Sequence, residues 1–444
     1  MGLHVAGTPV PDTSPVAPAV SRRYAWLVFG LSFGLLLSDY MSRQVLNAVF
    51  PLLKAEWLLS DAELGTLSGV VALMVGVLTF PLSLLADRWG RVRILVLSAT
   101  AWSLATLGCA VAASYGQMLL GRFMVGVGEA AYGSVGIAVV LSVFPVGVRA
   151  TLSGAFIAGG SFGSVLGVSI GGAVAQELGW RWAFGVMGLF GLALAAVYGF
   201  LVTEKRLGSA STSRNASESG ERAPIRTQLP RLFSSVSVVC AYVGSGLQMF
   251  IAMALLAWMP SFLNRYYAMP PGEAGLVAGV FALIGGTGMI LCGIVADRLS
   301  RKAAARKWAV AIACSLGSLV LLMAGFHLPA GPLQLMLIGG GTLVAAGTAG
   351  PAAAMVANLT PAAIAATAFA TLTLANSLLG LAPGPAVTGM LADELGLLGA
   401  LRLIPLVALV TSTVFTIGMF SYEGDLRRLG SLPDLALKTP ELQS

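Results

Sequence analysis

The chain has 444 residues, of which 57% are hydrophobic and only 10% are charged. Soluble domains carry about 25% charged and roughly 45–50% apolar residues, so this composition excludes a water-soluble fold. The net charge of +7 does not indicate a nucleic-acid partner, because the cations lie in short segments between apolar stretches rather than along one face.

Twelve apolar stretches are long enough to cross a bilayer, which takes about 20 residues. Each is expected to be helical, because lipid offers no hydrogen-bond partners to free backbone groups. The sequence therefore predicts an all-α membrane protein with a lipid bilayer as its surroundings. The predicted spans are 24–45, 61–86, 93–113, 117–144, 151–176, 182–202, 234–262, 272–296, 308–327, 332–357, 362–391 and 398–421.

The predicted spans fall into two groups of six. Residues 204–231 hold Ser, Arg, Glu and Pro with almost no large apolar residue, a composition typical of a flexible linker. This linker separates an N-terminal bundle, 22–203, from a C-terminal bundle, 232–421. The polar residues 1–21 and 422–444 are expected to be cytosolic tails, the first of them disordered.

The cations predict the orientation of the chain. Of the 26 Lys and Arg residues, 20 fall in the tails, the linker and the loops that lie on one side of the twelve spans. Because positive loops stay in the cytosol, this side and both termini are predicted to be cytosolic, in a plasma or inner membrane. The opposite loops carry little charge, mainly Lys54, Glu56, Asp61 and Glu63 in the first of them. A monomer is expected.

A charged signature occurs twice, 210 positions apart, each time after the second span of a half. The first copy is Asp87-Arg88-Trp89-Gly90-Arg91 and the second is Asp297-Arg298-Leu299-Ser300-Arg301. A repeat this long in so apolar a chain indicates two copies of one membrane bundle in tandem. Tandem bundles rock about a central site, so a secondary transporter is the first hypothesis.

These signatures resemble the loop motif of the major facilitator superfamily. Span 4, with Arg122 and the run Gly126-Val127-Gly128-Glu129-Ala130, is similar to its spinster-like and anion-symporter branches. The resemblance implies twelve helices in two pseudo-symmetric six-helix bundles that work by alternating access. Those branches usually place an Asp directly before the span 1 Arg, whereas here Ser42 precedes Arg43 and the acid, Asp39, lies one turn earlier.

Away from the first residues of the spans, the predicted spans of the N-terminal half hold four charged residues: Asp39, Arg43, Arg122 and Glu129. Asp39 and Arg43 share a helix face, as do Arg122 and Glu129, so the two acids and two bases are expected to neutralise one another. Charge inside a membrane is expensive, which makes each residue a functional candidate. One interpretation is a proton relay in which a carboxylate meets an Arg in only one conformation; the other is a static ion-pair lock.

The loop signatures admit two interpretations. By resemblance, Asp87, Arg88, Arg91, Asp297 and Arg298 form gating motifs, with Asp87 pairing near span 11 to latch one conformer. The alternative is a solvated cluster that only sets orientation. The gate is favoured because an acid contributes little to a rule that counts Lys and Arg.

The spans of the C-terminal half carry almost no charge, so polar and aromatic residues are its candidate substrate contacts. A pocket needs only a few such groups, and packing is the alternative for each. The candidates are Gln248, Trp258, Asn376 and Tyr242.

The sequence predicts a secondary transporter of a small organic solute, driven by protons. A lysolipid or drug exporter of the same fold is one alternative, and a non-transporting receptor or scaffold is another. An enzyme is not expected, because no catalytic set and no ATP-binding loop occur. With only two histidines and dispersed cysteines, neither a metal nor another cofactor is predicted.

Overall fold

The computed structural model describes residues 20–145, 148–204, 233, 235–300, 305–360 and 364–430. The predicted N-terminal tail and linker lie almost wholly outside these residues, as does the predicted C-terminal tail beyond residue 430. All of the structural statements that follow concern the described part of the chain.

The N-terminal half consists of long helices. Its first helix, α1, begins after Ser21, whose hydroxyl accepts a hydrogen bond from the Tyr24 N–H at 3.3 Å and so caps the helix. It ends where Leu58 adopts a left-handed conformation, with φ of 54°. The helices of this half are α1 (Arg22–Trp57), α2 (Asp61–Trp89), α3 (Arg91–Ala110), α4 (Tyr115–Glu129), α5 (Tyr132–Val143), α6 (Arg149–Leu178) and α7 (Trp180–Leu201).

The C-terminal half repeats this order. Its fourth span is interrupted at Gly347 and Thr348, just as the fourth span of the first half is interrupted at Ala130 and Ala131. The elements are α10 (Val236–Tyr267), α11 (Pro271–Ser300), α12 (Arg306–His327), α13 (Pro332–Ala346), α14 (Ala349–Leu359), α15 (Ala365–Asn376), the π-helical turn η3 (Ser377–Leu381), α16 (Pro383–Leu403), the 3-10 turn η4 (Ile404–Leu406) and α17 (Val407–Gly430).

The number of spans agrees with the prediction. Eleven described stretches are long and apolar enough to cross a membrane, and the last of them, Thr367–Arg428, has 62 residues. That length corresponds to two spans, and non-helical backbone at Gly396, with φ of 72°, separates them. The edges differ from the prediction, because α1 continues past residue 45 to Trp57 and α17 continues past residue 421 to Gly430.

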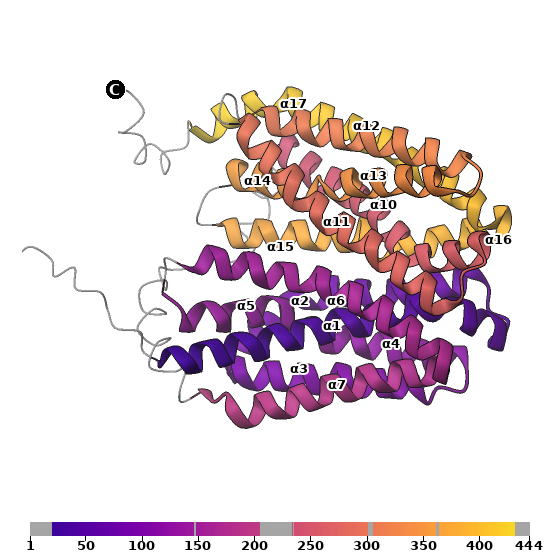
Figure 1. Ribbon diagram of the computed structural model, residues 1–444. Helices are drawn as coiled ribbons and strands as arrows, with labels where there is room; N and C mark the ends of the chain where they lie inside the picture. The colour runs from indigo at the N-terminus through magenta and orange to yellow at the C-terminus, as the bar shows by residue number, and fades with distance from the viewer. Residues whose placement is uncertain are drawn as a thin grey trace, which may run out of the picture.

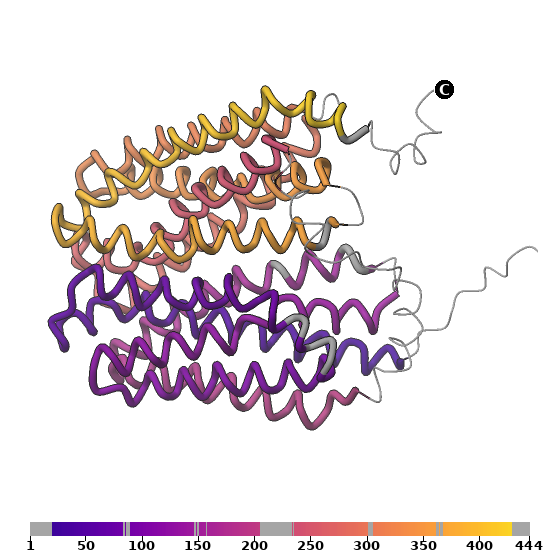
Figure 2. Tube along the Cα trace, turned by 180° about the vertical axis from the view of Figure 1, so that it is seen from behind, coloured from indigo at the N-terminus to yellow at the C-terminus, as the bar shows by residue number. Residues whose placement is uncertain are grey.

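The two halves lie side by side as separate bundles, with the first half below the second in Figure 1. The start of α1 and the end of α17 lie at the same end of the molecule, which Figure 2 shows from behind. We call the opposite end, which holds the α1–α2 and α10–α11 connections at residues 58–60 and 268–270, the outer end, and the end with the start of α1 the inner end.

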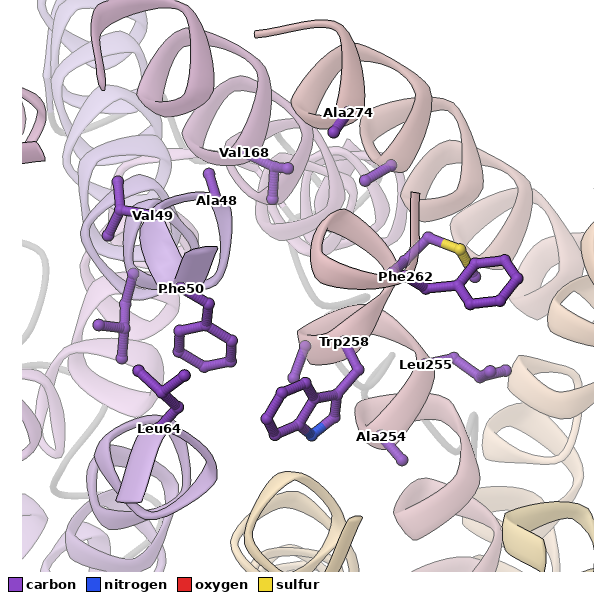
Figure 3. Close-up of a cluster of buried hydrophobic side chains, with 14 of the residues drawn as sticks. Ala48, Val49, Phe50, Leu64, Val168, Ala254, Leu255, Trp258, Phe262 and Ala274 are labelled. Carbon is purple, nitrogen blue, oxygen red and sulfur yellow. The ribbon is translucent and has the colours of Figure 1, made fainter. Parts of the chain in front are cut away.

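An apolar core joins the halves towards the outer end. Phe50 on α1 and Trp258 on α10 face each other with ring centroids 5.2 Å apart, and Leu64 and Val168 lie in the same cluster (Figure 3). Two further clusters lie within single halves, one around Trp102 and one around Trp308. The shared core therefore closes the outer end, while each half keeps a core of its own.

Candidate functional site

The central feature of the site is a buried cluster of charges between α1 and α4. Arg43 Nε lies 2.6 Å from Glu129 Oε2 and 3.5 Å from Asp39 Oδ1. Asp39 and Glu129 are only 3% and 2% exposed, whereas the Arg43 side chain keeps 21% of its surface accessible. The single guanidinium therefore faces two buried carboxylates, and it is the most accessible of the three side chains.

The fold brings these groups together through two local features. Asp39 and Arg43 are one helical turn apart on α1, so their side chains share a face. Glu129 is the last residue of α4, directly before the interruption at Ala130 and Ala131. The backbone of Ala130 and Ala131 stays in the right-handed helical region, so the fourth span continues through this local distortion.

Ser42 belongs to this cluster and was not among the predicted site residues. Its Oγ lies 3.1 Å from Glu129 Oε1 and 2.8 Å from the Asp39 carbonyl oxygen. One hydroxyl proton serves only one acceptor at a time, so a protonated Glu129 has an acceptor in Ser42 while Ser42 donates to the carbonyl. The sequence feature that could have identified Ser42 is its position directly before Arg43, where the spinster-like and anion-symporter branches usually carry an Asp.

The contacts of Arg122 differ from the prediction that the four charged side chains neutralise one another. Its Nη1, Nη2 and Nε donate to the carbonyl oxygens of Ser42, Arg43 and Leu67 at 2.9, 3.2 and 3.3 Å. Arg122 and Glu129 both contact Ser42 and Arg43, but Arg122 meets their backbone carbonyls whereas Glu129 meets their side chains. Arg122, which is 1% exposed, instead fastens α4 to α1 and α2 through backbone.

Of the predicted substrate contacts of the C-terminal half, Gln248, Trp258 and Tyr242 are buried and Asn376 is half-buried. Gln248 donates from Nε2 to Ser318 Oγ at 3.1 Å, and within the described structure its Oε1 has no hydrogen-bond partner. The same holds for the Tyr242 hydroxyl and Asn376 Oδ1. Trp258 donates from Nε1 to the Pro385 carbonyl at 3.0 Å and packs on Phe50, so it belongs to the core between the halves.

Gln248 occupies the place in the second half that Asp39 occupies in the first. The two residues are separated by the same number of positions as Pro51 and Pro260, which lie inside α1 and α10. The second half thus has a neutral amide where the first half has a carboxylate. The buried cluster of Asp39, Arg43 and Glu129 therefore has no charged counterpart at Gln248 in the second half.

An apolar cavity of about 150 Å³ lies between α6 of the first half and α10, α11 and α13 of the second. Gln248 and Trp258 do not line it, although the residues that follow them, Met249 and Met259, do. Three hydroxyl-bearing residues interrupt its apolar wall. Its lining includes Ser161, Ser164, Met249, Met253, Met259, Phe281, Met289 and Thr342.

The predicted gating motifs lie at the inner end. The side chains of Asp87 and Arg88 are outside the described structure; Arg91 is half-buried, and Asp297 and Arg298 are exposed at the end of α11. Gly90 turns the chain between α2 and α3 with φ of 97°. There the Glu204 carboxylate accepts a hydrogen bond from the Val92 N–H at 2.7 Å and caps α3.

Comparisons with known proteins agree with this architecture. The chain is 28% identical over 302 residues to the probable L-galactonate transporter of Escherichia coli (strain K12), a match that covers 66% of each. It is 29% identical over 262 residues to protein spinster homolog 3 of Danio rerio, covering 57% of this chain and 52% of that protein. The matched stretches thus span about half to two thirds of these relatives.

A solved structure shares the fold. It is the crystal structure of a bacterial homolog of the human lysosomal transporter Spinster in an inward-facing and occupied conformation, with a TM-score of 0.81 and 19% identity, covering 91% of this chain and 99% of that one. Residues 31–385 match the family model of the Major Facilitator Superfamily. With twelve spans in two repeated bundles, the chain belongs to the Major Facilitator Superfamily, whose members are membrane transporters rather than enzymes.

Proposed function

We propose that the protein is a proton-coupled transporter that moves a small organic anion across the membrane by alternating access. The observation that carries this proposal is the close contact of Arg43 with Glu129, which pairs a reachable cation with a fully buried acid. A guanidinium binds a carboxylate through a planar fork, so Arg43 is the group that a substrate anion would engage.

The coupling follows from the charge balance of the cluster. An unpaired charge inside the membrane is costly, so Arg43 leaves Glu129 only if Glu129 becomes neutral. A protonated Glu129 Oε1 donates a hydrogen bond to the Ser42 hydroxyl, and the released guanidinium takes the substrate carboxylate in place of Glu129. One proton and one anion therefore enter together, and the net charge of the site does not change.

Asp39 keeps Arg43 within reach during this exchange. It lies on the same helix face, 3.5 Å from the guanidinium, and stays ionised as a second partner while Glu129 is neutral. Arg122 holds the α1 backbone at Ser42 and Arg43 in register throughout. In this proposal Glu129 is the proton carrier, Arg43 the anion site, Asp39 the auxiliary partner and Arg122 a positioning residue.

The similarity to a probable L-galactonate transporter supports an organic acid as the solute. The apolar cavity lined by methionines and Phe281 favours a second candidate, an amphiphile such as a lysolipid or a drug, whose acidic group would meet Arg43. Gln248, Asn376 and Tyr242, with their unused polar atoms, are proposed to contact the uncharged part of the solute. We further propose that both termini are cytosolic, on the positive-inside pattern, and that the protein acts as a monomer in the inner membrane.

The test is proton flux in proteoliposomes that contain a pH-sensitive dye. Galactonate, gallate and a lysophospholipid are each added outside, and wild-type protein is expected to acidify the lumen with one of them. Glu129→Gln is expected to abolish this proton entry while exchange of labelled for unlabelled solute persists. Proton entry at the wild-type rate in Glu129→Gln would remove Glu129 from the mechanism.

A further inference from the structure

The start of α2, at the outer end, is held by the other half of the molecule. The Asp61 N–H donates to Asp393 Oδ1 at 2.7 Å, and the Ala62 N–H donates to Asp393 Oδ2 at 2.9 Å. Asp393 lies on α16, so a carboxylate of the second half caps a helix of the first. The first N–H groups of a helix lack internal partners and carry partial positive charge, which makes them a fitting site for this carboxylate.

The side chain of Asp61, in turn, accepts hydrogen bonds from the second half. Its two oxygens meet the two terminal nitrogens of Arg265, at the end of α10, at 2.6 and 2.7 Å. Lys54, on α1, reaches Asp61 Oδ1 at 2.6 Å. Asp61 is 2% exposed, so this fork between the halves is largely shielded from water, where charge-assisted pairs are strongest.

Gly389 gives the two helices the room for this contact. It lies one turn before Asp393 on the same face of α16, directly against the backbone of Asp61. A Cβ at this position would collide with the Asp61 carbonyl oxygen, which is rigid backbone. Close approach of α16 and the start of α2 therefore depends on a residue without a side chain.

The same arrangement occurs once more with the halves exchanged. Gln176, near the end of α6, accepts a hydrogen bond from the Gly272 N–H at the start of α11 at 2.9 Å. The helices α2 and α11 are each the second of their half, and α6 and α16 each belong to the fifth span. Each half thus caps the second helix of the other, but only the contact at α2 carries charges.

We propose that Asp61, Arg265 and Asp393 form a latch that holds the outer end closed, with Gln176 and Gly272 as its weaker neutral counterpart. The proposal rests on the alternating access proposed above, because opening outward requires α2 to leave α10 and α16. The latch groups lie at helix ends, where water replaces their partners once the halves separate. The latch therefore sets the balance between the two conformers and does not block exchange between them.

The experiment measures distances between spin labels in lipid nanodiscs, with the four native cysteines replaced by alanine. One label pair replaces Val111 and Leu333, which are exposed at the outer ends of the first and second halves. The other pair replaces Trp89 and Leu299, exposed at the inner ends of α2 and α11. Arg265→Gln and Asp393→Asn are each expected to raise the population with a long outer distance at least fivefold and to shorten the inner distance in step.

Arg181→Gln is the matched control. Arg181 pairs with Glu56 at 2.8 Å at the same outer end, but both residues belong to the first half. This variant is expected to leave both distance distributions unchanged. Distributions of Arg265→Gln and Asp393→Asn that match the control would overturn the latch. Arg265→Lys, which keeps the charge without the fork, should give an intermediate population if either neutral variant folds poorly. Because the readout is distance, loss of proton coupling in Glu129→Gln would not count for or against the latch.

Discussion

Arg43 on α1 and Glu129 at the end of α4 form an ion pair in which Nε and Oε2 are 2.6 Å apart, and this contact links the first membrane span to the fourth. Its two sides differ, since the Glu129 side chain has no accessible surface whereas Arg43 retains 21%. A competing anion would therefore approach the pair from the arginine side.

Removing one partner of the pair is expected to be worse than removing both. Arg43→Gln leaves Glu129 and Asp39 as two buried acids, and loss of one member of a buried pair costs about 3 kcal/mol. The double variant Arg43→Gln with Glu129→Gln should recover part of this loss, because Asp39 is then the one buried acid of the cluster left without Arg43. Thermal unfolding in nanodiscs measures both. Equal melting temperatures for the single and double variants would contradict the pairing.

Ser42→Ala is expected to slow proton entry without unfolding the protein. The substitution removes the hydroxyl beside Glu129 Oε1, a loss of about 1 kcal/mol for one hydrogen bond. In the pH-dye assay we expect a severalfold slower proton flux for whichever solute drives it. The control is Ser315→Ala, because the Ser315 hydroxyl donates only along its own helix, to the Ala311 carbonyl at 3.0 Å. The prediction fails if the two variants have the same flux.

Arg122→Lys is expected to destabilise the protein although the charge is kept. The lysine ammonium cannot reproduce a planar fork that serves the carbonyls of Ser42, Arg43 and Leu67 together. Losing one or two hydrogen bonds from a charged donor corresponds to about 2–4 kcal/mol. Chemical or thermal unfolding should show this loss, whereas Arg181→Lys, at an exposed pair, should change stability very little. An Arg122→Lys protein as stable as wild type would show that the carbonyl contacts are incidental.

Gly389→Ala is expected to force α16 away from the start of α2. A new Cβ there meets backbone of Asp61, which cannot rotate away, so the outer end should open or the protein should lose about 1–3 kcal/mol of stability. Gly133→Ala is the control, because nothing lies within 4 Å of the Cβ added at that helical glycine. Protection of a cysteine at Phe50 from a water-soluble thiol reagent reports opening. Unchanged protection together with unchanged melting would argue against tight packing at Gly389.

Much of the architecture could be predicted from residues alone. Apolar runs of membrane length and the two Asp-Arg signatures predict the spans and the duplication, because each run reflects a local balance between a segment and its solvent. The orientation inferred from the clustered cations stays a prediction. Asp39, Arg43, Arg122 and Glu129 stand out for the same reason, since charge within an apolar run is conspicuous. The predicted ends of α1 and α17 come too early, because a helix can continue beyond its apolar stretch; the last turns of α17 carry the exposed side chains of Glu423 and Arg427.

What the charges do was decided only by tertiary structure. The sequence indicated that Arg122 and Glu129 share a helix face, but packing of α4 against α1 and α2 directs Arg122 to carbonyls and leaves Glu129 to Arg43. In the sequence, Asp61 was one of a few charged residues in a loop of little charge. Its partners Arg265 and Asp393 lie in the other half, far away along the chain. Spacing along a chain determines which side chains share a face, whereas the contacts between faces depend on how separate helices pack.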